Sequence, residues 1–160
     1  MTKSKKIISI ICAVAIVLLL LYFVPFPTRI DLDVEGMQVD QNGAFVANVD
    51  ITLDGWRLNY LFKEDALKLK PEIEINDSVV LTYMENPSAG RIFRLEEATS
   101  YAQVPVYLPK VNYTSTVTLA FEKDFQSFLI KTNDKSCYFF AEDSQLSAKD
   151  LYNIYLAYMG

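Results

Sequence analysis

The sequence predicts a mainly β protein, in which an N-terminal transmembrane helix precedes an antiparallel β-sandwich with a short C-terminal α-helix. Three observations support this class: an uncharged apolar block near the N-terminus, alternating apolar and polar residues over most of the remainder, and helical spacing at the C-terminal end. They divide the 160 residues into a basic segment at 1–6, an anchor at 7–26 and one extracytoplasmic domain at 27–160.

The anchor prediction depends on the block from Ile7 to Phe26, which contains no charged residue. A helix of this length rises about 30 Å, the thickness of a bilayer core. In lipid, backbone polar groups must be satisfied within the helix. Three lysines precede the block, and cationic flanks stay in the cytoplasm, so we expect the N-terminus inside and the domain outside. Pro25 is expected to end the helix.

A cleaved signal peptide is the alternative to an anchor. Its apolar region is shorter, about 7–15 residues, and the small-x-small triplet at residues 13–15 lies inside the block. Cleavage there would leave an exposed apolar end, so an uncleaved anchor is favoured.

Charge and cysteine content bear on partners and compartment. The net charge is −5, although the N-terminal segment is basic. An acidic outer domain disfavours nucleic acid and anionic lipid surfaces as partners. Cys12 lies in the anchor and Cys137 in the domain, too far apart to form a disulfide. We therefore expect a bacterial cell membrane and a buried, inert Cys137.

Strand prediction is clearest directly after the anchor. Ile30, Leu32 and Val34 alternate with acidic residues, which is typical of a half-buried strand. Asn42-Gly43 follows, and a second alternating run covers residues 45–54, so the two runs predict an antiparallel hairpin. Asp54-Gly55 is expected to form the next turn.

Shorter alternating runs continue to residue 141, with Pro71 as an edge or bulge marker. We expect a strand or an irregular crossover at 56–62, and strands near residues 67–70, 72–76, 79–84, 91–95, 103–108, 113–121, 128–132 and 136–141. About eight or nine short strands at this spacing favour an immunoglobulin-like sandwich.

The final segment, residues 147–158, changes to helical spacing. Ser147 is a candidate N-cap, and Asp150 follows at the capping-box position. The apolar face of this helix, expected to pack on the sheet, contains Leu151, Ile154, Tyr155 and Tyr158.

Chemical motifs are missing from the sequence. There is no histidine, so neither a Ser-His-Asp triad nor a Cys-His pair can form. Asp31, Asp33 and Glu35 lie along one strand face, which would not converge the six to eight or so oxygens that calcium requires. We predict no catalytic residue, no cofactor and no metal.

Function is therefore predicted only as a class. The leading hypothesis is an interaction or structural module that contacts a partner protein or a second copy. The alternative is an envelope glycan-binding domain, with the aromatic rings of Trp56 and Tyr60 as candidate ligand-binding residues. An enzyme is the third hypothesis, and a helix–helix contact through Ser9 and Cys12 in the membrane is a fourth.

Overall fold

The computed structural model describes residues 3–95, 99–122, 125–142 and 146–159, which form two α-helices, a 3₁₀ turn and nine strands. The helices are α1 (Lys3–Phe23) and α2 (Ala148–Met159), and the 3₁₀ turn is η1 (Pro109–Val111). The strands are β1 (Phe26–Val39), β2 (Phe45–Asn59), β3 (Ala66–Ile75), β4 (Ser78–Tyr83), β5 (Gly90–Arg94), β6 (Thr99–Leu108), β7 (Tyr113–Glu122), β8 (Ser127–Lys131) and β9 (Cys137–Ala141).

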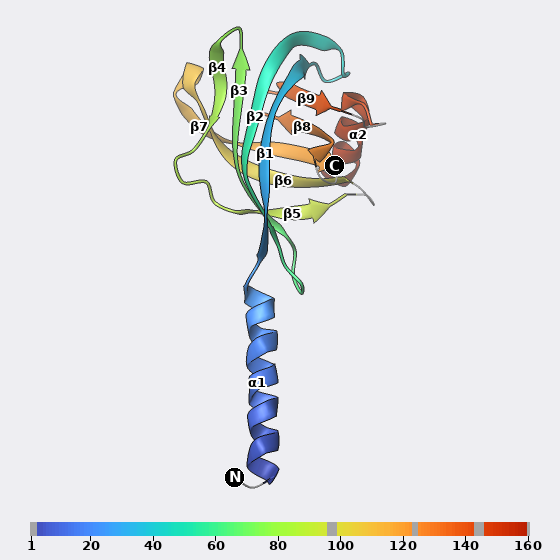
Figure 1. Ribbon diagram of the computed structural model, residues 1–160. Coiled ribbons are helices and arrows are strands. Elements are labelled where there is room, and N and C mark those ends of the chain that lie inside the picture. The colour runs from blue at the N-terminus through green and yellow to red at the C-terminus, as the bar shows by residue number, and fades with distance from the viewer. Residues whose placement is uncertain (1–2, 96–98, 123–124, 143–145, 160) are drawn as a thin grey trace.

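Helix α1 stands apart from the domain (Figure 1). Its stretch Lys5–Phe23 is long and apolar enough to span a membrane, and no part of it is buried against the rest of the described chain. The helix ends at Phe23 rather than at Phe26, because Pro25 cannot continue the helical hydrogen bonding. Phe26 is instead the first residue of β1, so the domain begins directly at the end of the helix.

The nine strands form one antiparallel sheet that closes on itself, so the immunoglobulin-like arrangement of two separate sheets is not confirmed. Neighbours pair in the order β2-β1-β9-β8-β7-β6-β4-β3-β5, and a further β2–β3 pairing completes the circuit. Strands β1 to β4 lie lengthwise, roughly along the direction of the helix axis, whereas β5, β6, β8 and β9 run across them (Figure 1). The closed sheet therefore encloses its core between two crossing layers.

Strands β2 and β3 are each continuous where the sequence predicted an interruption, a turn at Asp54-Gly55 in β2 and a break at Pro71 in β3. Asp54-Gly55 forms no turn: Gly55 lies inside β2, paired with Ile30 on one side and Leu69 on the other. A Cβ at Gly55 would lie 2.2 Å from the Lys68 carbonyl oxygen, so glycine here permits close strand approach. Pro71 lies within the single strand β3 and pairs with Leu53.

The remaining predicted strands and the C-terminal helix are confirmed, with ends shifted by a few residues. The main core lies inside the closed sheet, and a second cluster forms where α2 covers the outer side of β7, β8 and β9. Ser147 and Asp150 form the predicted capping box: the Ser147 N–H donates to Asp150 at 2.9 Å, and the Asp150 N–H to Ser147 Oγ at 3.2 Å. Leu151 is fully buried; the side chain of Tyr158 lies outside the described part.

Candidate functional site

Strand β1 has one open edge. Toward β2 it is paired along its full length, from Phe26 to Val39. Toward β9 it is paired only from Met37 to Val39. In the described residues, the segment from Phe26 to Gly36 therefore has a strand partner on one side only. Half of its backbone N–H and C=O groups point away from β2 and are available to a further strand.

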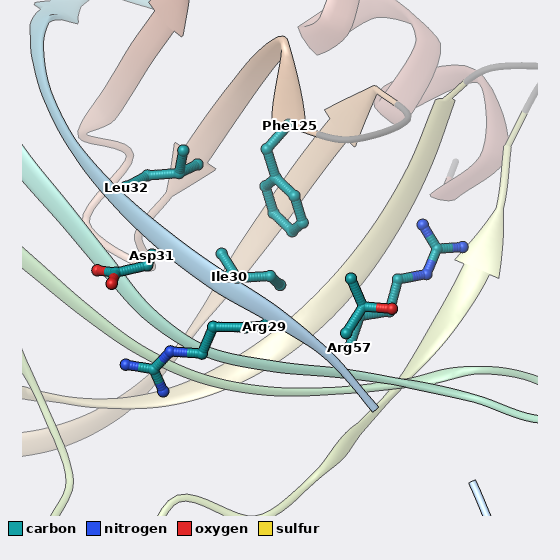
Figure 2. A pocket seen from close by; sticks show the side chains of 7 residues that line it. Arg29, Ile30, Asp31, Leu32, Arg57 and Phe125 are labelled. Carbon is teal, nitrogen blue, oxygen red and sulfur yellow. The ribbon is translucent and has the colours of Figure 1, made fainter. Parts of the chain in front are cut away.

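A cavity of about 300 Å³ lies along this edge (Figure 2). Five consecutive residues of β1, Thr28 to Leu32, line it, together with Arg57 and Phe125. Consecutive residues point to opposite faces of a strand, so a cavity that touches all five follows the edge of β1 rather than one face. Its volume is about twice the ~150 Å³ that accommodates a benzene ring, which is enough for a large apolar side chain.

Phe125 closes the far side of this cavity from the segment between β7 and β8 (Figure 2). Its backbone has φ +59°, a conformation that bulky residues rarely adopt. Its ring stacks on Phe121 with centroids 4.6 Å apart and is almost fully buried. The core thus holds Phe125 in a strained backbone conformation facing Ile30 and Leu32, and such strain is concentrated at functional sites.

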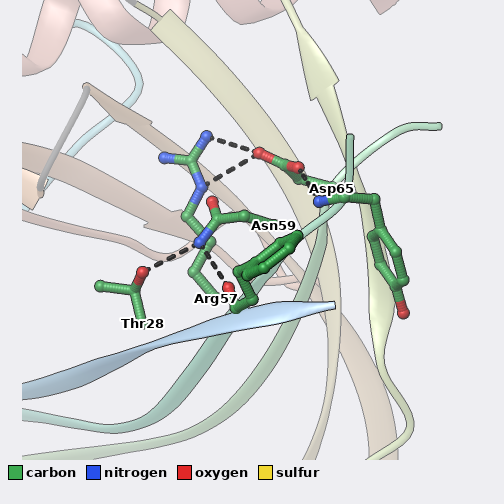
Figure 3. A network of polar contacts seen from close by, with 6 residues as sticks. Thr28, Arg57, Asn59 and Asp65 are labelled. Atoms are coloured by element: carbon green, nitrogen blue, oxygen red, sulfur yellow. Dashed lines mark hydrogen bonds and ion pairs between the residues drawn. The ribbon is translucent and has the colours of Figure 1, made fainter. Parts of the chain in front are cut away.

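A polar network fixes the end of the edge that lies next to α1 (Figure 3). The Arg57 guanidinium donates to Asp65 Oδ2 through Nη2 at 3.0 Å and Nε at 3.3 Å, and the Tyr60 N–H donates to Asp65 Oδ1 at 3.0 Å. Asn59 Nδ2 donates to the Phe26 carbonyl and to Thr28 Oγ1, both at 2.9 Å. Because these bonds join β1, β2 and the β2–β3 turn, the edge is held in place before any ligand binds.

The outer face beside the edge is acidic. Register places Asp31 opposite Asp54, Glu35 opposite Asp50, and Asp50 opposite Glu74. Like charges directly opposite destabilise a sheet. Positive charges on the same face are Arg29, which contacts Asp54 at 2.5 Å, Lys70, which lies opposite Asp54, and Lys68, which lies opposite Trp56. The carboxylates of this face, which we call the acidic face, are those of Asp31, Asp33, Glu35, Asp50, Asp54, Glu72 and Glu74.

The two predicted ligand-binding aromatics lie near this region but are not brought together by any contact in the described structure. Trp56 lies on the outer face of β2, 41% exposed, with the Arg29 guanidinium 5.2 Å from its ring centroid. Tyr60 follows the end of β2, with Lys63 Nζ 3.9 Å from its ring centroid. A cation covers one face of each ring, so a shared stacking platform for sugar stays a prediction.

Arg57 and Phe125 were not recognised in the sequence as site residues. Arg57 lies in an alternating run without a motif, and Phe125 lies in a charged break between strands. Only the closure of the sheet brings them beside Thr28–Leu32. The open edge itself had a partial signal, since acidic residues alternate along β1 and charges are typical of exposed edges.

Chemistry elsewhere in the described residues is sparse. They contain no group of three or more acidic or cysteine side chains that could hold a metal ion. Cys137 is buried, as expected, and burial raises the pKa of its thiol, which keeps it in the unreactive protonated form. The chain matches no protein-family model, no curated protein and no solved structure, so its own geometry carries the functional argument.

Proposed function

We propose that this chain is a single-pass, membrane-anchored interaction module that binds an extended segment of a partner protein along the open edge of β1. Helix α1 serves as the anchor, with the N-terminus in the cytoplasm and the domain outside a bacterial cell membrane. The observation that supports the module is the unpaired edge from Phe26 to Gly36 with a cavity of about 300 Å³ beside it. Strand addition supplies affinity through backbone hydrogen bonds and specificity through such cavities.

The acidic face determines what kind of strand fits. A second copy of β1 would bring Asp31, Asp33 and Glu35 opposite the same residues in registers centred on Asp33, and like charges there oppose pairing. A segment in which Lys or Arg alternates with apolar residues would meet opposite charge on the outer face. Its apolar side chains would point inward, where Ile30, Leu32 and Phe125 line the cavity.

A crosslinking experiment tests the proposal in intact cells. A photo-crosslinking amino acid replaces Asp33, which is exposed on the open edge, or Gln103, which is also exposed but lies on β6, paired with Thr118 of β7. The expected result is one protein adduct from position 33 and none from position 103. Mass spectrometry of the adduct should show a Lys- or Arg-containing extended segment at the crosslink.

A charge-reversal variant completes this test. Changing Asp31, Asp33 and Glu35 together to Lys should abolish the adduct formed from a crosslinker at Thr28, whereas Glu85→Lys, an exposed change outside the acidic face, should not. An adduct that survives the triple reversal would contradict the basic partner. A homodimeric adduct would indicate self-association instead, and retention of glycan without any protein would favour the alternative of a carbohydrate-binding domain.

A further inference from the structure

From the position of the β2–β3 turn, we infer that its apolar tip inserts into the lipid interface beside α1 and seats the domain on the membrane. The tip is formed by Leu61 and Phe62, and the inference rests on the proposed anchoring role of α1. It names a second membrane contact, separate from the spanning helix and from the open edge of β1.

The tip exposes two bulky apolar side chains in succession. Leu61 is 57% exposed and Phe62 is 56% exposed. Removing such apolar side chains from water is favourable, yet more than half of each stays exposed in the described structure. Turns in water favour polar residues, so two adjacent bulky apolar residues here suit an apolar surrounding.

The turn lies at the level where α1 ends (Figure 1). Lys63 Nζ is 6.0 Å from the ring centroid of Phe23, the last residue of α1. A cavity of about 510 Å³ between helix and turn is lined by Tyr22 from the helix and by Tyr60 and Lys63 from the turn. Aromatic residues at the end of a spanning helix mark the membrane–water interface, so the contact with Phe23 places the turn there as well.

Asp65 holds the turn in shape through its side chain and its backbone carbonyl (Figure 3). Asp65 accepts hydrogen bonds from Arg57 and from the Tyr60 N–H, and its carbonyl accepts from the Ile92 N–H at 2.8 Å. These bonds tie both sides of the turn to the sheet. Leu61 and Phe62 are therefore presented outward by a braced turn.

Charges of both signs lie around the turn. Lys63, Glu64 and Arg91 line the cavity beside α1, and Glu64 pairs with Arg91 at 3.7 Å. Lys63 can extend its ammonium group to phosphate while its stem lies along apolar surface. The acidic face is on the outer side of β1, β2 and β3, beyond the membrane-proximal ends of these strands. The domain can therefore contact lipid through its near end although its net charge is negative.

Fluorescence quenching in vesicles tests this inference with the full chain. In a Trp56→Phe background, which removes the native indole, Phe62→Trp places a single probe at the tip. Phe45→Trp is the matched control, because Phe45 is 61% exposed and begins β2 beside the β1–β2 turn, at the other end of the domain (Figure 1). The vesicles are phosphatidylcholine with brominated acyl chains, which quench indoles within the bilayer.

We expect several-fold stronger quenching for Phe62→Trp than for Phe45→Trp, with both variants floating with the vesicles. Equal, weak quenching in floated samples would overturn the inserted tip and leave the anchor intact. Failure of both variants to float after an alkaline wash would instead overturn the proposed anchor. If Phe62→Trp does not fold, Leu61→Trp gives the same readout from the neighbouring position.

Discussion

One edge of β1 has a neighbouring strand along its full length, and the other has one only at its end. We expect the paired edge to contribute mainly to stability and the open edge mainly to binding. On the β2 side, pairing is continuous apart from one irregularity between Gln38 and Val39, and β2 itself continues into pairing with β3. On the other side, pairing stops at Met37. The paired side buries side chains such as Ile51 and Leu53 completely, whereas a cavity lies along the open side. We expect substitutions on the paired side to unfold the protein and those on the open side to affect mainly binding.

The largest expected effect is that of Gly55→Ala on the paired side. The new Cβ would lie 2.2 Å from the Lys68 carbonyl oxygen and 2.8 Å from Leu69 Cα, and both are backbone atoms that cannot move aside alone. Ordinary overpacking costs about 1–3 kcal/mol, and this clash should exceed it and prevent folding. Circular dichroism of the full chain in detergent measures the outcome; a folded variant of unchanged stability would show that β3 is loosely held.

The substitutions Leu53→Ala in β2 and Leu32→Ala in β1 compare the stability contributed by the two strands directly. These two leucines are register partners, but Leu53 is fully buried and Leu32 only partly. Leu53→Ala should lower the free energy of unfolding by about 2–5 kcal/mol, and Leu32→Ala by clearly less. Urea unfolding of both variants in detergent checks this order, and equal losses would mean that the open side is packed as tightly as the paired side.

Removing one charge from the acidic face should stabilise the protein slightly, whereas the substitutions above destabilise it. Asp50 lies opposite Glu35 on one side and Glu74 on the other, so Asp50→Asn relieves repulsion and should raise the free energy of unfolding by about 0.5 kcal/mol. The gain should shrink in high salt. Glu85→Gln, outside this face, serves as the control. A destabilised Asp50→Asn variant would show that the carboxylate is kept for structure rather than for a partner.

The smallest expected effect concerns the turn that joins β1 to β2. Hydrogen bonds from the backbone N–H groups of Ala44 and Asn42 lower the pKa of Asp40 from its ordinary 3.8. Since the folded-state pKa is the lower one, this stabilisation is fully present above pH 3.8 and is lost as the pH falls through the lowered value. The difference in unfolding free energy between wild type and Asp40→Ala, present at pH 6, should therefore shrink as the pH falls below 3.8. A constant difference would exclude the carboxylate as the cause.

Local sequence patterns predicted most helices and strands. The predictions that were wrong concern positions where contact with a strand distant in the sequence determines the local structure. The β1–β2 hairpin follows from alternation around Asn42-Gly43, whose Gly43 adopts φ +80°. The capping box at Ser147 was likewise readable, because its partners lie within one helical turn. Gly55 was interpreted as a turn because glycine serves both turns and close strand contacts, and only the position of Lys68 distinguishes the two uses.

The sequence by itself determined the apolar helix, the alternating strands, the C-terminal cap and the lack of imidazole chemistry, because each depends on residues close together in the chain. Tertiary structure alone decided that the sheet closes on itself, that β1 keeps an open edge, and that Phe125 and Arg57 meet Thr28–Leu32 across a cavity. The physical reason is that strand partnership depends on which segments can share hydrogen bonds and exclude water together, and alternation shows which face is buried but not which strand lies beside it.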